Sequence, residues 1–208
     1  MVQLIMRNSQ LVLVLGGARS GKSTFAQHLA QRSERSVAII ATATAGDEDM
    51  RQRIMHHRAA RPSHWHTIEE PLKLAEALHQ AAGVADVILL DCLTVWLSNW
   101  LFSQGDPDHV EAATALSNST EGALDAIEEL LTTLARLDGS KTLIAVTNEV
   151  GQGIVPAYTI GRIYRDILGQ VNQRLAAVAT RVYLMVAGLG VDLKRLHEEA
   201  FLSLFMED

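Results

Sequence analysis

The sequence predicts an open α/β fold, in which helices cover both faces of a mostly parallel, doubly wound sheet. Short apolar runs of strand length alternate with helix-length periodic segments along the chain, and the runs are continuous in Val, Ile and Leu. Continuous runs are typical of parallel strands buried on both faces, and strand–helix alternation is typical of βαβ units. A glycine-rich string that follows the first run indicates the same class.

The expected elements follow from these runs in chain order. Strands are predicted at residues 11–15, 36–42, 87–91, 142–147 and 182–187, and the alternating stretch at 64–69 is a candidate for a further strand. Helices are predicted near residues 21–32, 47–60, 71–82, 94–102, 121–137 and 159–179.

Two segments are predicted to be peripheral. Residues 104–120 are rich in Asp, Ser, Thr and Asn and contain Pro107, which predicts a surface excursion between helices. Residues 193–208 are predicted to form a short terminal helix that docks through one apolar face. That face comprises Leu193, Leu196, Ala200 and Leu204.

Composition narrows the class of protein. The 208 residues are 48% hydrophobic and 20% charged, which excludes a disordered chain, and the net charge of −6 argues against a general nucleic-acid binder. The single cysteine excludes an intrachain disulfide or a cysteine-based zinc site. No apolar run reaches the roughly 18 residues of a membrane span, and the first ten residues do not resemble a secretory signal. We therefore expect a cytoplasmic protein.

The domain organisation is expected to be simple. No internal repeat and no linker divides the sequence. One domain over residues 1–208 is predicted, with residues 1–10 and 192–208 as terminal extensions.

The most specific motif is GGARSGKS, which matches G-x-x-x-x-G-K-[ST] between a predicted strand and a predicted helix. Glycines let successive backbone N–H groups face phosphates, and the helix start adds a partial positive charge. Lys22 is expected to reach the β- and γ-phosphates, and the Ser23 hydroxyl to ligate Mg²⁺. The alternative is a glycine-rich turn without a ligand. The predicted nucleotide-binding loop comprises Gly16, Gly17, Ala18, Arg19, Ser20, Gly21, Lys22 and Ser23. The fold expected from it is the P-loop NTPase type with a RecA-like sheet.

Asp91 ends the third main apolar run and is a candidate second ligand for Mg²⁺, which is expected at the end of a neighbouring strand. The alternative is that it caps the following helix. Cys92 is expected to be a small packed side chain rather than a reactive thiol.

A phosphate loop does not name a reaction, because switches, motors and small-molecule kinases share it. Switch GTPases read guanine with Asn-Lys-x-Asp, which does not occur in this sequence. A DNA-directed ATPase is expected to have a basic surface, and the net charge of −6 argues against that class. Phosphoryl or nucleotidyl transfer to a small molecule is the leading class that remains.

The stretch from residue 53 to 70 combines histidines with cations. Arg53, Arg58 and Arg61 surround the adjacent pair His56–His57 in this stretch, and Arg51 precedes it. Flanking guanidinium groups disfavour a protonated imidazole, so a histidine here would be neutral and nucleophilic, and the cations would hold a phosphate chain beside it. Two other interpretations stay open: a metal site formed with His64 and His66, and ordinary surface histidines.

Several strings together resemble a known family. GGARSGKS, IAT, RIMHHRAARPSHW, VTNEVGQGIVP and RDILGQVNQRLA look like the bifunctional adenosylcobinamide kinase / adenosylcobinamide-phosphate guanylyltransferase of cobalamin biosynthesis. The resemblance extends from about residue 11 to residue 191, and its later strings are more distinctive than the phosphate loop.

The resemblance implies two reactions. ATP or GTP phosphorylates the aminopropanol hydroxyl of adenosylcobinamide, and GTP then guanylylates His56, which passes GMP to the new phosphate to give adenosylcobinamide-GDP. It also implies a homotrimer, with the corrinoid and the nucleotides as partners and neither nucleic acid nor membrane. The further nucleotide-binding residues that it implies are Ala41, Thr42, Ala43, His57, Arg58, Ala59, Ala60, Glu69 and Asp91.

The role of Glu69 remains open within this interpretation. Glu69 could accept hydrogen bonds from guanine, or it could be a solvated strand end. The alternatives to the bifunctional enzyme are a monofunctional P-loop kinase for another small molecule and a non-enzymatic nucleotide-dependent regulator.

Overall fold

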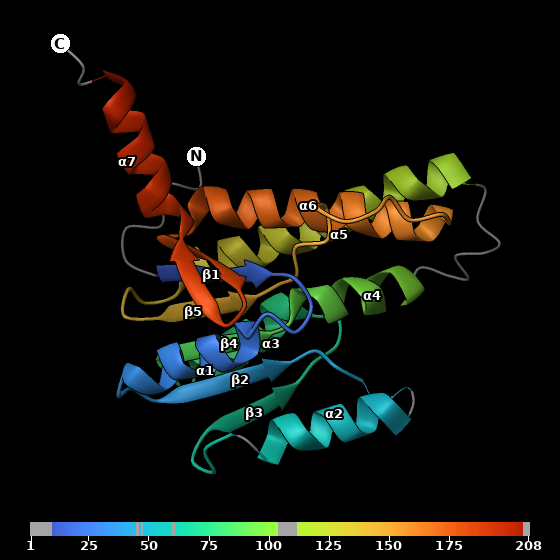
Figure 1. Cartoon of the computed structure of the whole chain (residues 1–208). Helices are drawn as coiled ribbons and strands as arrows, with labels where there is room; N and C mark the ends of the chain where they lie inside the picture. The colour runs from blue at the N-terminus through green and yellow to red at the C-terminus, as the bar shows by residue number, and fades with distance from the viewer. Residues whose placement is uncertain (1–9, 45, 47, 60, 104–111, 206–208) are drawn as a thin grey trace.

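The computed structural model describes residues 10–205, apart from residues 45, 47, 60 and 104–111. Strands and helices alternate through most of this length (Figure 1). The strands are β1 (Gln10–Gly16), β2 (Val37–Ala41), β3 (His66–Glu69), β4 (Val87–Asp91), β5 (Thr142–Val146), β6 (Arg181–Val186) and β7 (Leu189–Asp192). The helices are α1 (Lys22–Arg32), α2 (Glu48–Ala59), α3 (Leu74–Ala82), α4 (Leu93–Ser103), α5 (Ala112–Arg136), α6 (Thr159–Val178) and α7 (Leu193–Phe205).

The strands form one sheet in the order β3-β2-β4-β5-β1-β6-β7. Every pair of neighbours is parallel except β6–β7, which is antiparallel. The predicted open, mostly parallel α/β fold is therefore confirmed. Strand β5 lies between β1 and β4, so the strand that precedes the phosphate loop and the strand that ends in Asp91 are not direct neighbours.

Alternate residues of the central strands enter two separate cores. In β1, Leu11, Leu13 and Leu15 pack with residues of α3 to α6, whereas Val14 packs with residues of α1 on the other face. The same alternation holds in β2, β4 and β5. Because both faces are covered, both sets of positions must be apolar, and this explains the continuous runs in the sequence.

The two layers of helices are unequal. Four helices, α3 to α6, cover one face of the sheet, and α1 covers the other. Helix α2 lies beside β3 at the open edge of the sheet (Figure 1). This leaves α2 next to the carboxyl ends of β2 and β3, where ligands of open α/β sheets bind.

Two predictions about peripheral segments need correction, and one strand was missed. Helix α5 begins at Ala112, so the excursion predicted for residues 104–120 is helical from that residue on, and residues 104–111 lie outside the described part of the chain. Strand β7 was not predicted. It pairs with β6 through a two-residue turn in which Ala187 and Gly188 both have positive φ, the geometry of a tight hairpin turn.

The terminal helix α7 forms as predicted, but its described side chains, up to residue 200, do not dock along one apolar face. Leu193 packs against the core, whereas Leu196 is 49% exposed and the helix points away from the sheet (Figure 1). Leu204 lies where side chains are not described. Among the described residues, no helix is both long and apolar enough to cross a bilayer.

Candidate functional site

The phosphate loop connects β1 to α1 and depends on two glycines. Gly16 has φ 150° and Gly21 has φ 94°, conformations that side chains disfavour. A Cβ on Gly16 would lie 2.5 Å from the carbonyl oxygen of Met185, and one on Gly21 would lie 3.2 Å from the Cα of Gly188. The loop is therefore enclosed by the β6–β7 turn, and Gly188 donates its N–H to the carbonyl of Ser20 at 3.0 Å.

Two polar side chains of the loop are buried. Lys22 folds back so that its Nζ donates to the carbonyl of Gly17 at 2.5 Å. Burial lowers the pKa of Lys22, and the neighbouring Cys92 and Asp91 oppose this effect. The Ser20 hydroxyl is buried with no hydrogen-bond partner among the described residues. Both groups are donors that a bound phosphate chain could engage.

Ser23 and Asp91 meet across the sheet. The Ser23 hydroxyl donates to Oδ1 of Asp91 at 3.2 Å, although the two residues are 68 positions apart in the chain. They meet because α1 starts at the end of β1, while β4, two strands away, ends at the same edge of the sheet. Asp91 thus lies beside the loop as expected, but the prediction that its strand neighbours β1 is wrong, because β5 lies between β1 and β4. In the described chain no group of three or more His, Cys, Asp or Glu could hold a metal by itself.

A hydrogen-bond network joins the carboxyl ends of β2 and β4. Thr42 is fully buried, and its Oγ1 donates to the carbonyl of Cys92 at 2.8 Å and accepts from the N–H of Cys92 at 3.0 Å. The Thr42 N–H donates to the carbonyl of Asp91, and the Thr42 carbonyl accepts from Asn99 Nδ2 at 2.8 Å. Thr42 thus fixes the backbone at Asp91 and Cys92, and Asn99 holds Thr42 in place.

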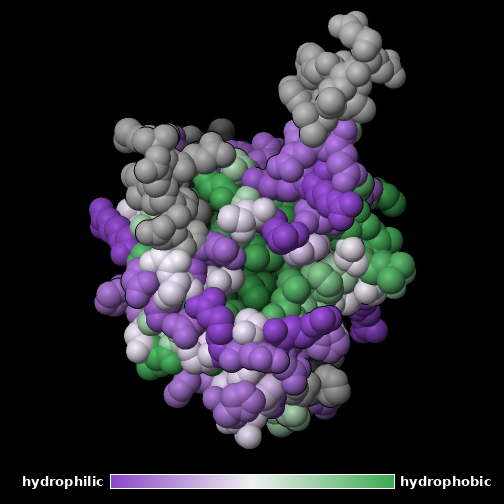
Figure 2. All heavy atoms as spheres, turned by 90° about the vertical axis from the view of Figure 1, so that its left-hand side faces the viewer, coloured by the Kyte–Doolittle hydropathy of each residue, from purple (hydrophilic) through white to green (hydrophobic). Residues whose placement is uncertain are grey.

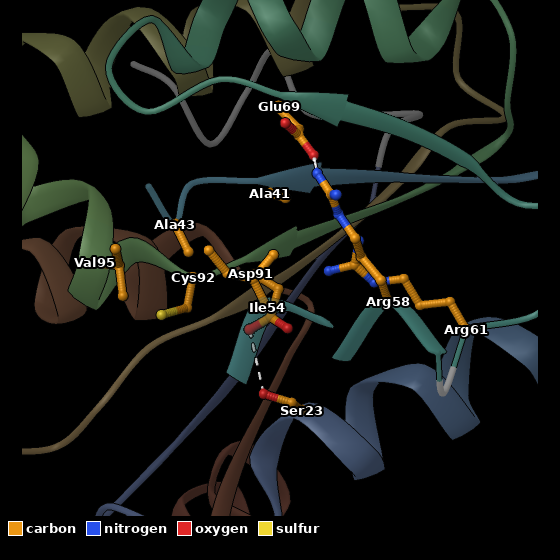
Figure 3. A pocket seen from close by; sticks show the side chains of 10 residues that line it. All are labelled: Ser23, Ala41, Ala43, Ile54, Arg58, Arg61, Glu69, Asp91, Cys92 and Val95. Atoms are coloured by element: carbon orange, nitrogen blue, oxygen red, sulfur yellow. Dashed lines mark hydrogen bonds and ion pairs between the residues drawn. The ribbon is translucent and has the colours of Figure 1, made fainter. Parts of the chain in front are cut away.

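A cavity of about 200 Å³ opens at this edge of the sheet (Figure 3). Six of its lining residues were predicted to bind nucleotide or Mg²⁺: Ser23, Ala41, Ala43, Arg58, Glu69 and Asp91. Four others were not assigned to the nucleotide: Ile54, Arg61, Cys92 and Val95. Because Ile54 and Arg58 belong to α2, the cavity brings the end of the phosphate loop and the histidine-bearing helix into one site.

The two arginines of the cavity have different surroundings. Arg58 forms an ion pair with Glu69, and both side chains are about half exposed. The Glu69 carboxylate is therefore neither free nor simply solvated. The guanidinium of Arg61 lies deeper, and burial lowers its pKa, with Asp91 opposing that shift and Arg58 adding to it. Arg61 was not predicted to bind nucleotide, and the one sequence feature that pointed to it was its place in the cluster of arginines around the histidine pair.

Cys92 lines the cavity but is not activated. Burial raises the pKa of its thiol to about 11, and the charge of Asp91 acts in the same direction. The thiol is therefore protonated at neutral pH, as expected for a packed side chain.

The remaining predicted residues are placed less completely. Gly17, Ala18 and Arg19 form the exposed outer part of the phosphate loop, and Ala59 is exposed at the end of α2. His56 and His57 belong to α2, but their side chains lie outside the described part of the structure, as does Ala60. His64 and His66 are exposed. The roles of the histidines therefore stay predictions.

Comparison with known proteins identifies relatives over nearly the whole length. The family model described as cobinamide kinase / cobinamide phosphate guanyltransferase matches residues 12–193. The chain is 43% identical over 188 residues to the bifunctional adenosylcobalamin biosynthesis protein CobU of Escherichia coli, covering 88% of this chain and 99% of that protein. It is 44% identical over 182 residues to the bifunctional adenosylcobalamin biosynthesis protein CobP of Pseudomonas aeruginosa, covering 88% of this chain and 96% of that protein.

Among solved structures, the chain resembles a prototypical ATPase from the type III secretion system of pathogenic bacteria, with a TM-score of 0.56 and 11% identity. The match covers 93% of this chain and 54% of that ATPase, and at this identity it bears on the fold alone. It agrees with the predicted P-loop NTPase fold. The family match covers the strands, the phosphate loop and the cavity alike, and on that basis the chain belongs to the cobinamide kinase / cobinamide phosphate guanyltransferase family.

Proposed function

We propose that this enzyme phosphorylates adenosylcobinamide with ATP or GTP and then transfers GMP from GTP, through a guanylylated His56, to give adenosylcobinamide-GDP. The cavity is the observation that carries the proposal. Ser23, at the end of the phosphate loop, and Arg58, two residues from His56 on α2, line the same space. A nucleotide held by the loop would therefore lie beside the helix that bears the nucleophile.

Ser23, at the start of α1, and Asp91, at the end of β4, are suited to bind Mg²⁺. The Ser23 hydroxyl and the Asp91 carboxylate are hard oxygen donors within hydrogen-bond distance of each other, the type of ligand that Mg²⁺ prefers. These two residues would hold the ion together with phosphate oxygens of the substrate. Bound Mg²⁺ would supply charge neutralisation to the phosphates.

The kinase step is in-line phosphoryl transfer. The hydroxyl oxygen of the aminopropanol arm attacks the γ-phosphorus, the bond to the β–γ bridging oxygen breaks, and the nucleoside diphosphate leaves. The N–H groups of the phosphate loop and the Lys22 ammonium would bind the phosphate oxygens. In the structure this ammonium donates to Gly17, so nucleotide binding would exchange that contact for a phosphate.

The second step is covalent. A neutral imidazole nitrogen of His56 attacks the α-phosphorus of GTP and pyrophosphate leaves. A phosphate oxygen of adenosylcobinamide phosphate then attacks the phosphorus of the phosphoramidate, and the imidazole is released. In this step Arg58, which lines the cavity, and Lys22, in the adjoining phosphate loop, would supply positive charge for the triphosphate, balanced in part by Glu69 and Asp91.

The proposal is tested by incubating the protein with GTP labelled in the α-phosphate, without corrinoid. We expect acid-labile, base-stable label on the protein, lost in His56→Ala and retained in His64→Ala, an exposed histidine outside the cavity. Label that persists in His56→Ala would refute the assignment of the nucleophile.

The kinase step is tested separately with γ-labelled nucleotide and adenosylcobinamide. We expect Lys22→Ala to lose this activity about 10²–10³-fold, as for removal of one preorganised donor in other enzymes. We expect His56→Ala to retain it. Phosphorylation of adenosylcobinamide without any covalent GMP would instead favour a monofunctional kinase.

We also propose that the chain forms a homotrimer, as the resemblance implies. The β6–β7 hairpin supports self-association, because Val186, Leu189 and Val191 are 57%, 73% and 39% exposed on the last strands of the sheet. Figure 2 shows hydrophobic surface on the side of the molecule that carries this hairpin. Light scattering after gel filtration tests the proposal, and a monomeric mass at micromolar concentration would contradict it.

A further inference from the structure

Arg61 carries buried hydrogen-bond donors that the protein does not satisfy. Its Nε and Nη1 are shielded from solvent and have no hydrogen-bond partner among the described residues. A guanidinium is charged at all physiological pH values, and a buried charged donor without a partner costs more than a neutral one. The position therefore needs an acceptor that the described part of the chain does not supply.

The other arginines with described contacts show how unusual this is. Arg58 pairs with Glu69, Arg174 with Glu128, Arg181 with Asp192 and Arg195 with Glu199. These four side chains are more exposed than Arg61, so water could satisfy them, whereas Arg165, which is only partly exposed like Arg61, pairs with Asp166. Arg61 thus combines the deeper position with the missing partners.

The direction of the side chain suggests the missing acceptor. Figure 3 shows Arg58 reaching up to Glu69, while Arg61 extends across the cavity toward Asp91. Asp91 is already hydrogen-bonded to Ser23, at the start of α1. The guanidinium therefore faces the space next to the end of the phosphate loop, where the outer phosphates of a bound nucleotide would lie.

We propose that Arg61 binds the γ-phosphoryl group of the nucleotide and stabilises the charge on its oxygens during transfer to the acceptor hydroxyl. The inference rests on the proposed kinase function and adds a residue to it. In the loose transition state of phosphoryl transfer, charge is spread over three equatorial oxygens, and an arginine aimed at them accelerates the reaction. Arg61 would approach these oxygens from the α2 side, and Lys22 from the loop. Before nucleotide binds, the Nε and Nη1 donors of Arg61 would stay without a hydrogen-bond partner, which lowers the stability of the nucleotide-free protein.

The first test measures binding of a transition-state analogue and needs no corrinoid. GDP alone and GDP with aluminium fluoride, which mimics the transferring phosphoryl group, are titrated with Mg²⁺ against the wild type and Arg61→Met. We expect Arg61→Met to weaken the aluminium fluoride complex more than tenfold and GDP alone less than threefold. Equal losses for both ligands, or no loss for either, would overturn the proposal.

The second test separates the two reactions. We expect Arg61→Met to lower kcat of adenosylcobinamide phosphorylation about 10²-fold, with KM for the nucleotide changed less than fivefold, and to leave covalent labelling by α-labelled GTP at the wild-type level. A parallel loss of covalent labelling would contradict a role specific to the γ-phosphoryl group. Wild-type protein that fails to phosphorylate the corrinoid would refute the proposed function, and the analogue titration would still decide the role of Arg61.

A stability measurement distinguishes this role from a structural one. Because Nε and Nη1 of Arg61 have no hydrogen-bond partner among the described residues, we expect Arg61→Met to unfold at the same temperature as the wild type or higher in the absence of nucleotide. Arg174→Met, which breaks the pair with Glu128 far from the cavity, is the matched control, and we expect it to bind both GDP ligands normally. A clear loss of stability in Arg61→Met without nucleotide would indicate a structural partner and overturn the proposal.

Discussion

Removing the hydroxyl of Thr147 should destabilise the protein through a second residue. Thr147 follows β5, is fully buried, and its Oγ1 donates to Oδ1 of Asn172 on α6 at 2.9 Å. Asn172 is 7% exposed, and its Nδ2 donates to the carbonyl of Asn148 at 3.0 Å. Thr147→Val keeps the shape of the side chain but leaves Oδ1 of Asn172 buried without its donor. A buried unsatisfied acceptor costs about 1–3 kcal/mol, so we expect the free energy of unfolding to fall by that amount.

The double-mutant cycle gives the sharper test. Asn172→Leu alone leaves both the Thr147 hydroxyl and the Asn148 carbonyl without a partner, whereas Thr147→Val with Asn172→Leu leaves only the carbonyl. We therefore expect the double variant to lose less stability than the sum of the single variants, by about 0.5–3 kcal/mol. Urea unfolding at one protein concentration measures this, with an unchanged m-value as the check on two-state behaviour.

Thr142→Val at the start of β5 is the matched control. Thr142 is partly exposed, and we expect its loss to change stability by less than about 0.5 kcal/mol. Additive effects in the cycle, or a Thr147→Val variant as stable as the control, would refute the account of this network.

Two further predictions concern the loop and the thiol. Gly16→Ala should lower the free energy of unfolding by about 1–3 kcal/mol, because the new Cβ would meet the Met185 carbonyl and φ at this position is positive. Gly17→Ala is the control, since nothing lies within 4 Å of its new Cβ, and its thermal unfolding should stay close to that of the wild type. Equal effects of the two substitutions would contradict this prediction. Because the folded pKa of Cys92 is about 11 and the ordinary value is 9.0, the unfolded chain loses the thiol proton first, so stability should fall as pH rises from about 9 to about 11. Cys92→Ala should reduce that fall in urea midpoints measured at pH 8 and pH 10.5, and an unchanged fall would show that other groups cause it.

The elements that the sequence predicted well are those whose signal is local. The runs that became β1, β2, β4 and β5 are apolar at every position because each strand is covered on both faces. Strand β7 escaped detection because it has four residues, includes Gly190 and is mostly exposed, so it carries neither an apolar run nor an alternation. Its turn contains Ala187 rather than the Asn or Asp that favours positive φ. The start of α5 was missed because the run at residues 117–120, within its first turns, consists of Ser, Asn and Thr, residues that are more typical of caps and turns than of helix interiors.

The sequence by itself determined the phosphate loop, its place between a strand and a helix, and the family, because glycine spacing and buried runs are properties of short segments. Only the tertiary structure decided that β5 separates β1 from β4 and that Ser23 nevertheless reaches Asp91. It also decided that Arg58 pairs with Glu69, while Nε and Nη1 of Arg61 have no hydrogen-bond partner among the described residues. The physical reason is that strand order and side-chain partners depend on how crossovers bring distant segments to one edge of the sheet. Neighbouring residues in the chain carry no record of those contacts.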